Sequence, residues 1–271
     1  MTETGTTASV TFIGNATTLL RLGDFTLLTD PAFGAAGTRV HLGYGAWTKR
    51  VKDPAMRLAD LPRVDAVLLS HFHSDHFDRV ASRGLPRDLQ VVTTVQARRA
   101  LRRRGFEAVQ ALPTWDVYEW TSARQRLRVT AVPAKHGPGA VDRLLPETMG
   151  SVLELEEDGR LRLRLYITGD TLFGPHLTAI PRRCGEIDAM LIHLGGTRLL
   201  GLLLTMDDRQ GVATTELIRP GLTVPIHFND YKVMKSTLSD YLARAREHGL
   251  EGVEPISRGA TMSLPLRPVP A

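Results

Sequence analysis

The fold is decided by residues 70–78, which read Ser70-His71-Phe72-His73-Ser74-Asp75-His76-Phe77-Asp78. Three histidines and two aspartates lie within this segment, directly after the apolar run 66–69. A short continuous apolar run predicts a strand that is buried on both faces. Imidazole nitrogen and carboxylate oxygen are the ligands that suit zinc and its first-row neighbours. The segment therefore predicts a metal site at a strand end and is poorly explained as a stretch of polar loop residues.

Two points of coordination are expected from this segment. His71 and His73 are two residues apart in an extended loop, so both can face one point, while Asp75 and His76 can turn toward a second. Three further candidates follow predicted strands: His136 after 126–132, Asp170 after 161–168, and His227 after 224–226. Taken singly, each of the three could be a structural residue. Because α/β sites gather at the carboxyl ends of strands, the ordered set favours a shared metal site.

The alternation of strand-like and helix-like patterns predicts an α/β fold. Strands are expected at residues 10–13, 17–22, 25–29, 66–69, 89–93, 126–132, 151–155, 161–168, 189–193 and 224–226. Helices are expected at about residues 96–104, 177–182, 207–218 and 235–247. We interpret residues 1–271 as one domain in which two sheets are sandwiched between helices.

The composition is that of an ordinary soluble globular protein, with 42% hydrophobic and 23% charged residues among 271. Cys184 is the only cysteine, which excludes an intramolecular disulfide, and the polar N-terminus does not read as a secretory signal. No apolar stretch is long enough to span a bilayer. We therefore expect a cytoplasmic protein without an integral membrane segment. The pattern leaves the oligomeric state open.

The net charge of +5 mildly favours an anionic small-molecule substrate through long-range attraction. The densest basic run is Arg98 to Arg104, in a helix-like segment that ends at Gly105. A solvated helix face is the favoured interpretation, since no aromatic residues are interleaved as in a nucleic-acid-binding surface. A nucleic-acid partner is therefore not expected.

The metal-binding pattern also resembles a known family. His71-x-His73-x-Asp75-His76, followed by His136, Asp170 and His227, resembles the full ligand series of the metallo-β-lactamase superfamily, and the resemblance covers nearly the whole chain. Several segments are similar to the branch that contains the L-ascorbate-6-phosphate lactonases and the N-acyl-phosphatidylethanolamine phospholipase D-type enzymes: Gly14-Asn15-Ala16-Thr17, Leu28-Thr29-Asp30-Pro31, Met206-Asp207 and Pro225-Ile226-His227. The resemblance implies a four-layer αβ/βα sandwich of the metallo-β-lactamase type.

The resemblance further implies a division of the ligands between two divalent metal ions. His71, His73 and His136 would bind one ion, Asp75, His76 and His227 would bind the other, and Asp170 would bridge them. Zinc is the first choice, with Mn²⁺ or Fe²⁺ as alternatives for such nitrogen and oxygen ligands. A hydroxide held between two ions is a nucleophile at neutral pH. Asp75 and Asp170 are the expected catalytic residues, Asp75 as a ligand that also accepts the proton of the attacking water.

Three functions are consistent with this pattern. The leading one is hydrolysis of an ester-like bond, a lactone or carboxylic ester, because the chain resembles the lactonases. Cleavage of a phosphodiester, or of a phospholipid by a phospholipase D-type reaction, is the alternative indicated by the phospholipase-like segments. A non-hydrolytic metal-binding regulatory protein is the third. Retention of all seven ligands argues against that last function.

Three residues beside the ligand set have open roles. Asp30, at a strand end, is expected to orient a ligand histidine through its distal nitrogen, or else to serve as a turn aspartate. Asn15 stands where many relatives of this branch carry histidine, and amides are poor metal ligands. His193 precedes Gly195-Gly196 and either meets substrate or is a satisfied core histidine.

Apolar residues between the motifs are candidates for the pocket wall. These are residues 33–47 with His41, Tyr44 and Trp47, the leucine-rich run 199–204, and Phe228 and Tyr231. Ordinary core packing is the alternative for each. Lys49, Arg50 and Lys52 either face an anionic group or belong to a solvated loop, and the solvated loop is favoured.

Overall fold

The computed structural model describes residues 6–41 and 47–268, and in this part of the chain the strands form two large sheets. The first has the order β17-β1-β2-β3-β6-β7-β8. Its strands are β1 (Ala8–Gly14), β2 (Thr17–Leu22), β3 (Phe25–Thr29), β6 (Ala66–Leu68), β7 (Gln90–Thr93), β8 (Val109–Ala111) and β17 (Thr261–Ser263).

The second sheet has the order β16-β13-β12-β11-β10-β9. Its strands are β9 (Val117–Thr121), β10 (Gln125–Pro133), β11 (Met149–Glu157), β12 (Arg160–Ile167), β13 (Ala189–His193) and β16 (Leu222–Ile226). Two small hairpins complete the strands: β4 (Arg39–His41) with β5 (Trp47–Lys49), and β14 (Arg198–Leu199) with β15 (Leu202–Leu203).

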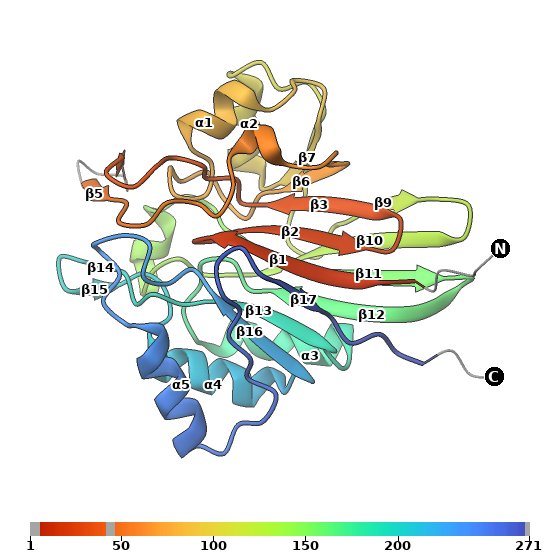
Figure 1. The fold of residues 1–271 in the computed structure, drawn as a ribbon. Coiled ribbons are helices and arrows are strands. Elements are labelled where there is room, and N and C mark those ends of the chain that lie inside the picture. Colours follow the sequence, from red (N-terminus) through yellow and green to blue (C-terminus); the bar gives the residue numbers. More distant parts are fainter. Residues whose placement is uncertain (1–5, 42–46, 269–271) are drawn as a thin grey trace.

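Helices cover the outer face of each sheet (Figure 1). The first sheet is covered by α1 (Arg79–Gly84) and α2 (Val95–Arg102), and the second by α3 (Ala179–Cys184), α4 (Asp208–Ile218) and α5 (Leu238–Glu247). Single 3₁₀ turns lie at Leu58–Asp60, Gly139–Arg143 and Pro175–Thr178. None of the helices in the described ranges has the length and apolar character that a bilayer crossing needs.

Three apolar clusters fill the spaces between the four layers. One joins the inner faces of the two sheets, with Val10 and Leu20 from the first and Leu165 and Leu191 from the second. A second lies under α1 and α2, and a third lies under α3, α4 and α5. The predicted α/β fold, a four-layer sandwich with two inner sheets, is therefore confirmed.

Strand direction determines where polar loop residues meet. In the first sheet β3, β6, β7 and β8 are parallel, and in the second β12, β13 and β16 are parallel. Strand β10 runs in the same direction as β12, because both are antiparallel to β11. The carboxyl ends of β10, β12, β13 and β16 therefore lie at one edge of the sheet, which is where an α/β fold places its site.

Most predicted elements are present, with shifted ends. The C-terminal helix begins at Leu238 rather than at Lys235, because the Thr237 side chain caps it in a capping box with Asp240. The helix predicted to run to Arg104 ends at Arg102. Its arginines are exposed, so the structure agrees with a solvated helix face.

The short elements α1, β8, β9 and β17 were not predicted. Strand β17 has three residues and pairs with β1 from the far end of the chain, so no local pattern reveals it. Helix α1 does have a local signal, because Asp78 at its N-cap accepts a hydrogen bond from the backbone of Ala81 at 2.8 Å. Asp78 is thus a helix cap, although it lies in the metal-binding segment.

The environment of Arg50 differs from the one predicted. The favoured interpretation placed it in a solvated loop with Lys49 and Lys52, which are exposed, but Arg50 is only 1% exposed. Its guanidinium lies 3.3 Å from the buried carboxylate of Asp230 and donates to the carbonyls of Ala32 and Gly34. Arg258 also pairs with Asp230. A charge so deeply buried needs such partners, and they come from segments far apart in the sequence.

We expect Asp230→Ala to destabilise the protein by about 3–5 kcal/mol, because it leaves Arg50 as a buried charge without its carboxylate. Urea unfolding followed by circular dichroism measures the change. Asp60→Ala, which breaks the exposed pair with Arg57, is the matched control and should leave the midpoint unchanged. Equal midpoints for the two variants would contradict the role given to Asp230.

Candidate metal centre

The seven predicted ligand residues converge at the carboxyl ends of the strands. His71, His73, Asp75 and His76 lie in the loop between β6 and α1. His136 follows β10, Asp170 follows β12 and His227 follows β16. The hairpins β4–β5 and β14–β15 lie at the same end of the molecule (Figure 1). All seven side chains are buried.

The first group is His71, His73 and His136. The Nδ1 atom of His73 lies 2.9 Å from His71 Nε2 and 3.2 Å from His136 Nε2. Three imidazole nitrogens therefore face one point, as ligands of a single ion must. His73 differs from its neighbours in presenting Nδ1 rather than Nε2.

The second group is Asp75, His76 and His227. The Nε2 atoms of the two histidines are 3.2 Å apart. The Oδ2 atom of Asp75 lies 3.7 Å from His76 Nε2 and 3.6 Å from His227 Nε2. These three residues form a second set of ligand atoms with a common centre.

Asp170 lies between the two groups. Its Oδ2 atom is 3.3 Å from His76 Nε2, 4.0 Å from His71 Nε2 and 3.9 Å from His136 Nε2. Its Oδ1 atom is 3.6 Å from His227 Nε2. The backbone can make this turn because Gly169 has φ +62, and a Cβ there would lie 2.5 Å from the carbonyl oxygen of Met149. The carboxylate thus has the position of a bridge.

A second layer of contacts orients the histidine rings. His136 Nδ1 lies 3.1 Å from the carbonyl oxygen of Leu204, and His227 Nδ1 lies 3.0 Å from that of Leu194. In each ring, Nδ1 therefore donates its proton to a carbonyl, and Nε2 is free to face the centre. Such partners fix both the tautomer and the orientation of a ligand histidine.

Asp30 orients His76 in the same way. Its Oδ2 atom lies 2.9 Å from His76 Nδ1, on the side of the ring away from Asp170. Ser70 holds the carboxylate, since its backbone N–H donates to Oδ1 at 2.7 Å and its hydroxyl to Oδ2 at 2.8 Å. The geometry favours the orienting role over that of a turn aspartate. Ser70, which directly precedes His71, was not among the predicted site residues.

Asn15 joins the two halves of the site. Its side-chain Nδ2 donates to the carbonyl of Asp75 at 2.8 Å, and its own carbonyl accepts from the backbone N–H of His227 at 2.8 Å. Its φ of 52° lies in the left-handed region, which asparagine tolerates well. The residue therefore acts through hydrogen bonds, where relatives of the resembled branch carry an imidazole.

The protonation of the histidines follows from burial and the neighbouring carboxylates. Burial lowers the pKa of His71 and His136 and brings that of His73 to about 3. Burial acts on the pKa of His76 in the same direction, but the carboxylates of Asp170, Asp75 and Asp30 outweigh it and raise that pKa well above its ordinary value. The first group is thus neutral, as metal ligands are.

The carboxylates remain ionised although they are buried. Burial alone would raise the pKa of Asp170 and Asp75, but the neighbouring histidines, chiefly His227 and His76, hold both well below the usual range. In the part of the chain that the structure describes, Asp75 Oδ1 and Asp170 Oδ1 are buried and have no hydrogen-bond partner. Buried anionic oxygens without partners are costly unless a cation meets them. The donor set therefore fits divalent metal ions.

The proposed wall residues divide into two kinds. Phe228 and Tyr231 are buried, and Phe228 packs on Phe12, so core packing describes them better than a pocket wall. Trp47 is 59% exposed and contacts His41. Tyr44 lies outside the described residues. Leu200, in the β14–β15 hairpin, is 96% exposed.

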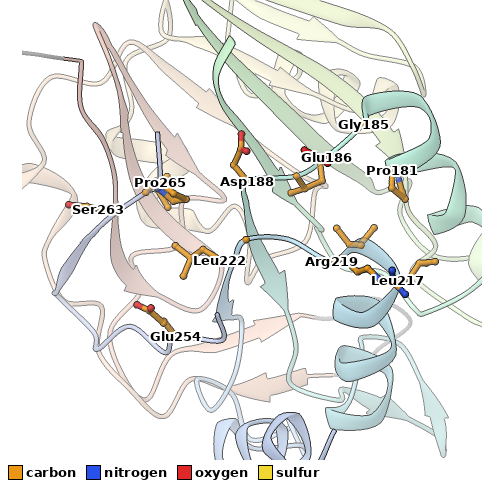
Figure 2. Close-up of a pocket in the computed structure, with 14 residues that line it drawn as sticks. Pro181, Gly185, Glu186, Asp188, Leu217, Arg219, Leu222, Glu254, Ser263 and Pro265 are labelled. Atoms are coloured by element: carbon orange, nitrogen blue, oxygen red, sulfur yellow. The ribbon is translucent and has the colours of Figure 1, made fainter. Parts of the chain in front are cut away.

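A surface hollow of about 980 Å³ lies elsewhere (Figure 2). Its lining includes Asp188, just before β13, and Leu222, the first residue of β16. These positions are at the amino ends of the strands, whereas His193 and His227 are at their carboxyl ends. The hollow is therefore separate from the histidine cluster.

Comparisons with known proteins identify the family and the fold. The beta-lactamase superfamily domain matches residues 26–228. A "UPF0173 metal-dependent hydrolase" of Anaeromyxobacter sp. (strain K) is 28% identical over 227 residues, which are 80% of this chain and 79% of that protein. An isothiocyanate hydrolase from Delia radicum gut bacteria has a similar structure, with a TM-score of 0.78, 22% identity and coverage of 95% of this chain and 99% of the other. A possible metal-dependent hydrolase from Veillonella parvula gives a TM-score of 0.79 at 20% identity, covering 96% of this chain and all of that one.

We expect Asp30→Ala to weaken zinc binding by about 10–100-fold, because His76 loses the partner that orients its ring. Competition with a chromogenic chelator measures the affinity. Asp158→Ala, in the exposed turn between β11 and β12, is the control and should bind zinc as the unaltered protein does. Unchanged zinc affinity in the Asp30 variant would show that the carboxylate is only a turn residue.

Proposed function

Because the chain belongs to the beta-lactamase superfamily, we propose that it is a metal-dependent hydrolase that opens an ester-like bond, with a lactone or carboxylic ester as the first choice. The relative in Anaeromyxobacter bears the name metal-dependent hydrolase, which supports the general reaction type. The observation that carries the proposal is the placement of Asp170 between two groups of ligand atoms.

We assign the candidate ligands to two ions according to the two groups. His71, His73 and His136 would hold one ion and Asp75, His76 and His227 the other, with Asp170 shared between them. When bound, two divalent ions, zinc in the first instance, supply an activated water and neutralise charge on the attacking and leaving oxygens.

The chain's own groups position the reactants. Asp75 is buried and ionised beside both groups of ligand atoms, so its carboxylate can accept a proton as well as act as a ligand. Its ionisation is maintained by His76 and His227, whose Nε2 atoms are 3.7 and 3.6 Å from Oδ2. Asn15 fixes the backbone that carries Asp75. With both ions bound, Asp170 would offset part of the repulsion between them.

Exposed apolar side chains around the cluster favour a substrate with an apolar body. Trp47 and Leu200 are 59% and 96% exposed, and Phe173 is 41% exposed. Phe173 and Leu200 belong to segments that also carry residues of the site. Phe173 follows Asp170 by three residues, and the segment of Leu200 continues to Leu204, the hydrogen-bond partner of His136. Apolar loops around a few placed polar groups are typical of small-molecule sites.

Phosphodiester cleavage is the second candidate. Lys49, at the end of β5, and the loop residues Lys135 and Lys232 are exposed. The backbone N–H of Leu172 donates to the carbonyl of Lys135, and that of Lys232 donates to the carbonyl of Lys49. Ammonium groups at these positions favour an anionic substrate through encounter and orientation. They are as compatible with a lactone that carries a phosphate as with a phosphodiester.

We expect chelation with a strong zinc ligand to reduce hydrolysis to background, and added zinc or manganese to restore it. The assay uses a panel of lactones and aryl esters beside bis(4-nitrophenyl) phosphate. Activity on the phosphodiester alone would reverse the order of the two candidates. Hydrolysis that survives complete removal of metal would overturn the proposed mechanism.

We expect Leu200→Ser and Trp47→Ala each to raise KM for long-chain esters by roughly tenfold, since each removes apolar area worth about 1.5 kcal/mol on burial. Steady-state kinetics on short- and long-chain esters measures the effect. Val117→Ser removes an exposed apolar side chain at the start of β9 and is the control. If all three variants behave alike, the apolar loops do not contact the substrate.

A further inference from the structure

His193 is a buried histidine outside the set of seven ligands. It is the last residue of β13 and is 1% exposed. Its backbone N–H donates to the hydroxyl of Thr168 at 2.9 Å, and its ring Nδ1 lies 3.3 Å from the same oxygen. Strand β13 and Thr168 thus fix the ring from one side.

The opposite edge of the ring, which carries Nε2, faces Asp30, the residue that orients His76. His193 Nε2 lies 3.6 Å from Asp30 Oδ2, the oxygen that also accepts from His76 Nδ1 and from the Ser70 hydroxyl. The His193 and His76 rings are nearly parallel, with an interplanar angle of 10° and centroids 6.1 Å apart. In the described part of the chain His193 Nε2 is buried and has no hydrogen-bond partner. A buried ring nitrogen of this kind needs one, and the nearest carboxylate is that of Asp30.

We propose that His193 is a positioning residue, which donates its Nε2–H to Asp30 and so keeps that carboxylate against the Nδ1–H of His76. The assignment rests on the proposed metal centre, because its effect reaches the reaction only through the orientation of His76. Neither alternative from the sequence describes it well. Its ring nitrogens face Thr168 and Asp30, and Nε2 has no hydrogen-bond partner among the described residues.

An ion held by Asp30, His76 and His193 is the competing explanation, since their ligand atoms also lie within 4.8 Å of one another. The geometry disfavours it. His76 Nε2 faces Asp170 and His227, while its Nδ1 lies 2.9 Å from Asp30. A neutral imidazole that binds one ion through Nε2 carries its proton on Nδ1, so it cannot bind a second ion there.

Substitution of His193 by asparagine or by glutamine separates the roles of its two ring nitrogens, because the two amide side chains differ in length. The side-chain nitrogen of asparagine reaches about as far as Nδ1 and can contact only Thr168. That of glutamine reaches one bond further, about as far as Nε2, and can donate to Asp30. His193→Asn and His193→Gln are therefore a matched pair, and His193→Leu removes both contacts.

The experiment measures zinc affinity of the purified full chain by competition with a chromogenic chelator, and the absorption spectrum of the cobalt-loaded protein. We expect His193→Asn and His193→Leu to weaken zinc binding by about 10–100-fold and to shift the cobalt bands. His193→Gln should recover most of that affinity. In an Asp30→Ala background, the His193 substitutions should have little further effect, because both residues act through one contact.

The experiment distinguishes failure of the role proposed for His193 from failure of the proposed function. Equal zinc affinity in the asparagine and glutamine variants would overturn the proposal, as would a wild-type chain that holds three ions and a His193→Asn chain that holds two. If His193→Leu fails to fold, the asparagine and glutamine pair still decides. A graded loss of zinc affinity in a protein that hydrolyses none of the esters tested would support His193 and count against the proposed function instead.

Discussion

The structure depends on how three buried carboxylates are neutralised. Asp30, Asp75 and Asp170 are almost completely buried, and an isolated ionised carboxylate could not remain in such surroundings. Six histidines surround them, and the two that are closest to Asp170 and Asp75, His76 and His227, have a raised pKa because burial is outweighed by those carboxylates. Protonated histidines can therefore supply positive charge that divalent ions would supply at the proposed metal centre.

This arrangement is possible because the two sheets present their strand ends to one place. The β6 loop brings four of the ligands from the first sheet, and β10, β12 and β16 bring the other three from the second. Each of the three apolar clusters is packed from hydrophobic side chains and contains none of the seven candidate ligands. A chain of this length can bury such a core without a structural metal.

The site was more predictable from the sequence than the details of the fold. The histidine-rich segment is local, and the other ligands follow strands whose apolar runs are easy to recognise, so their convergence could be expected. Arg50 was misplaced because its partners, Asp230 and Arg258, are distant in sequence and no local pattern reports them. Strand β17 was not predicted, because its partner β1 is equally distant in the sequence. His193 was noticed as unusual, but only the three-dimensional arrangement shows that it faces Asp30.

The hydrogen bonds of Asn15 have a consequence for how the chain assembles. The side chain of Asn15 donates to the carbonyl of Asp75 in the loop after β6, and the carbonyl of Asn15 accepts from the N–H of His227 after β16. Asn15 thus links the two halves of the chain. No fragment that contains only one half carries all members of either candidate ligand group, since His136 and His227 come from the second half and the rest of each group from the first. The proposed centre can therefore form only after the two halves have docked.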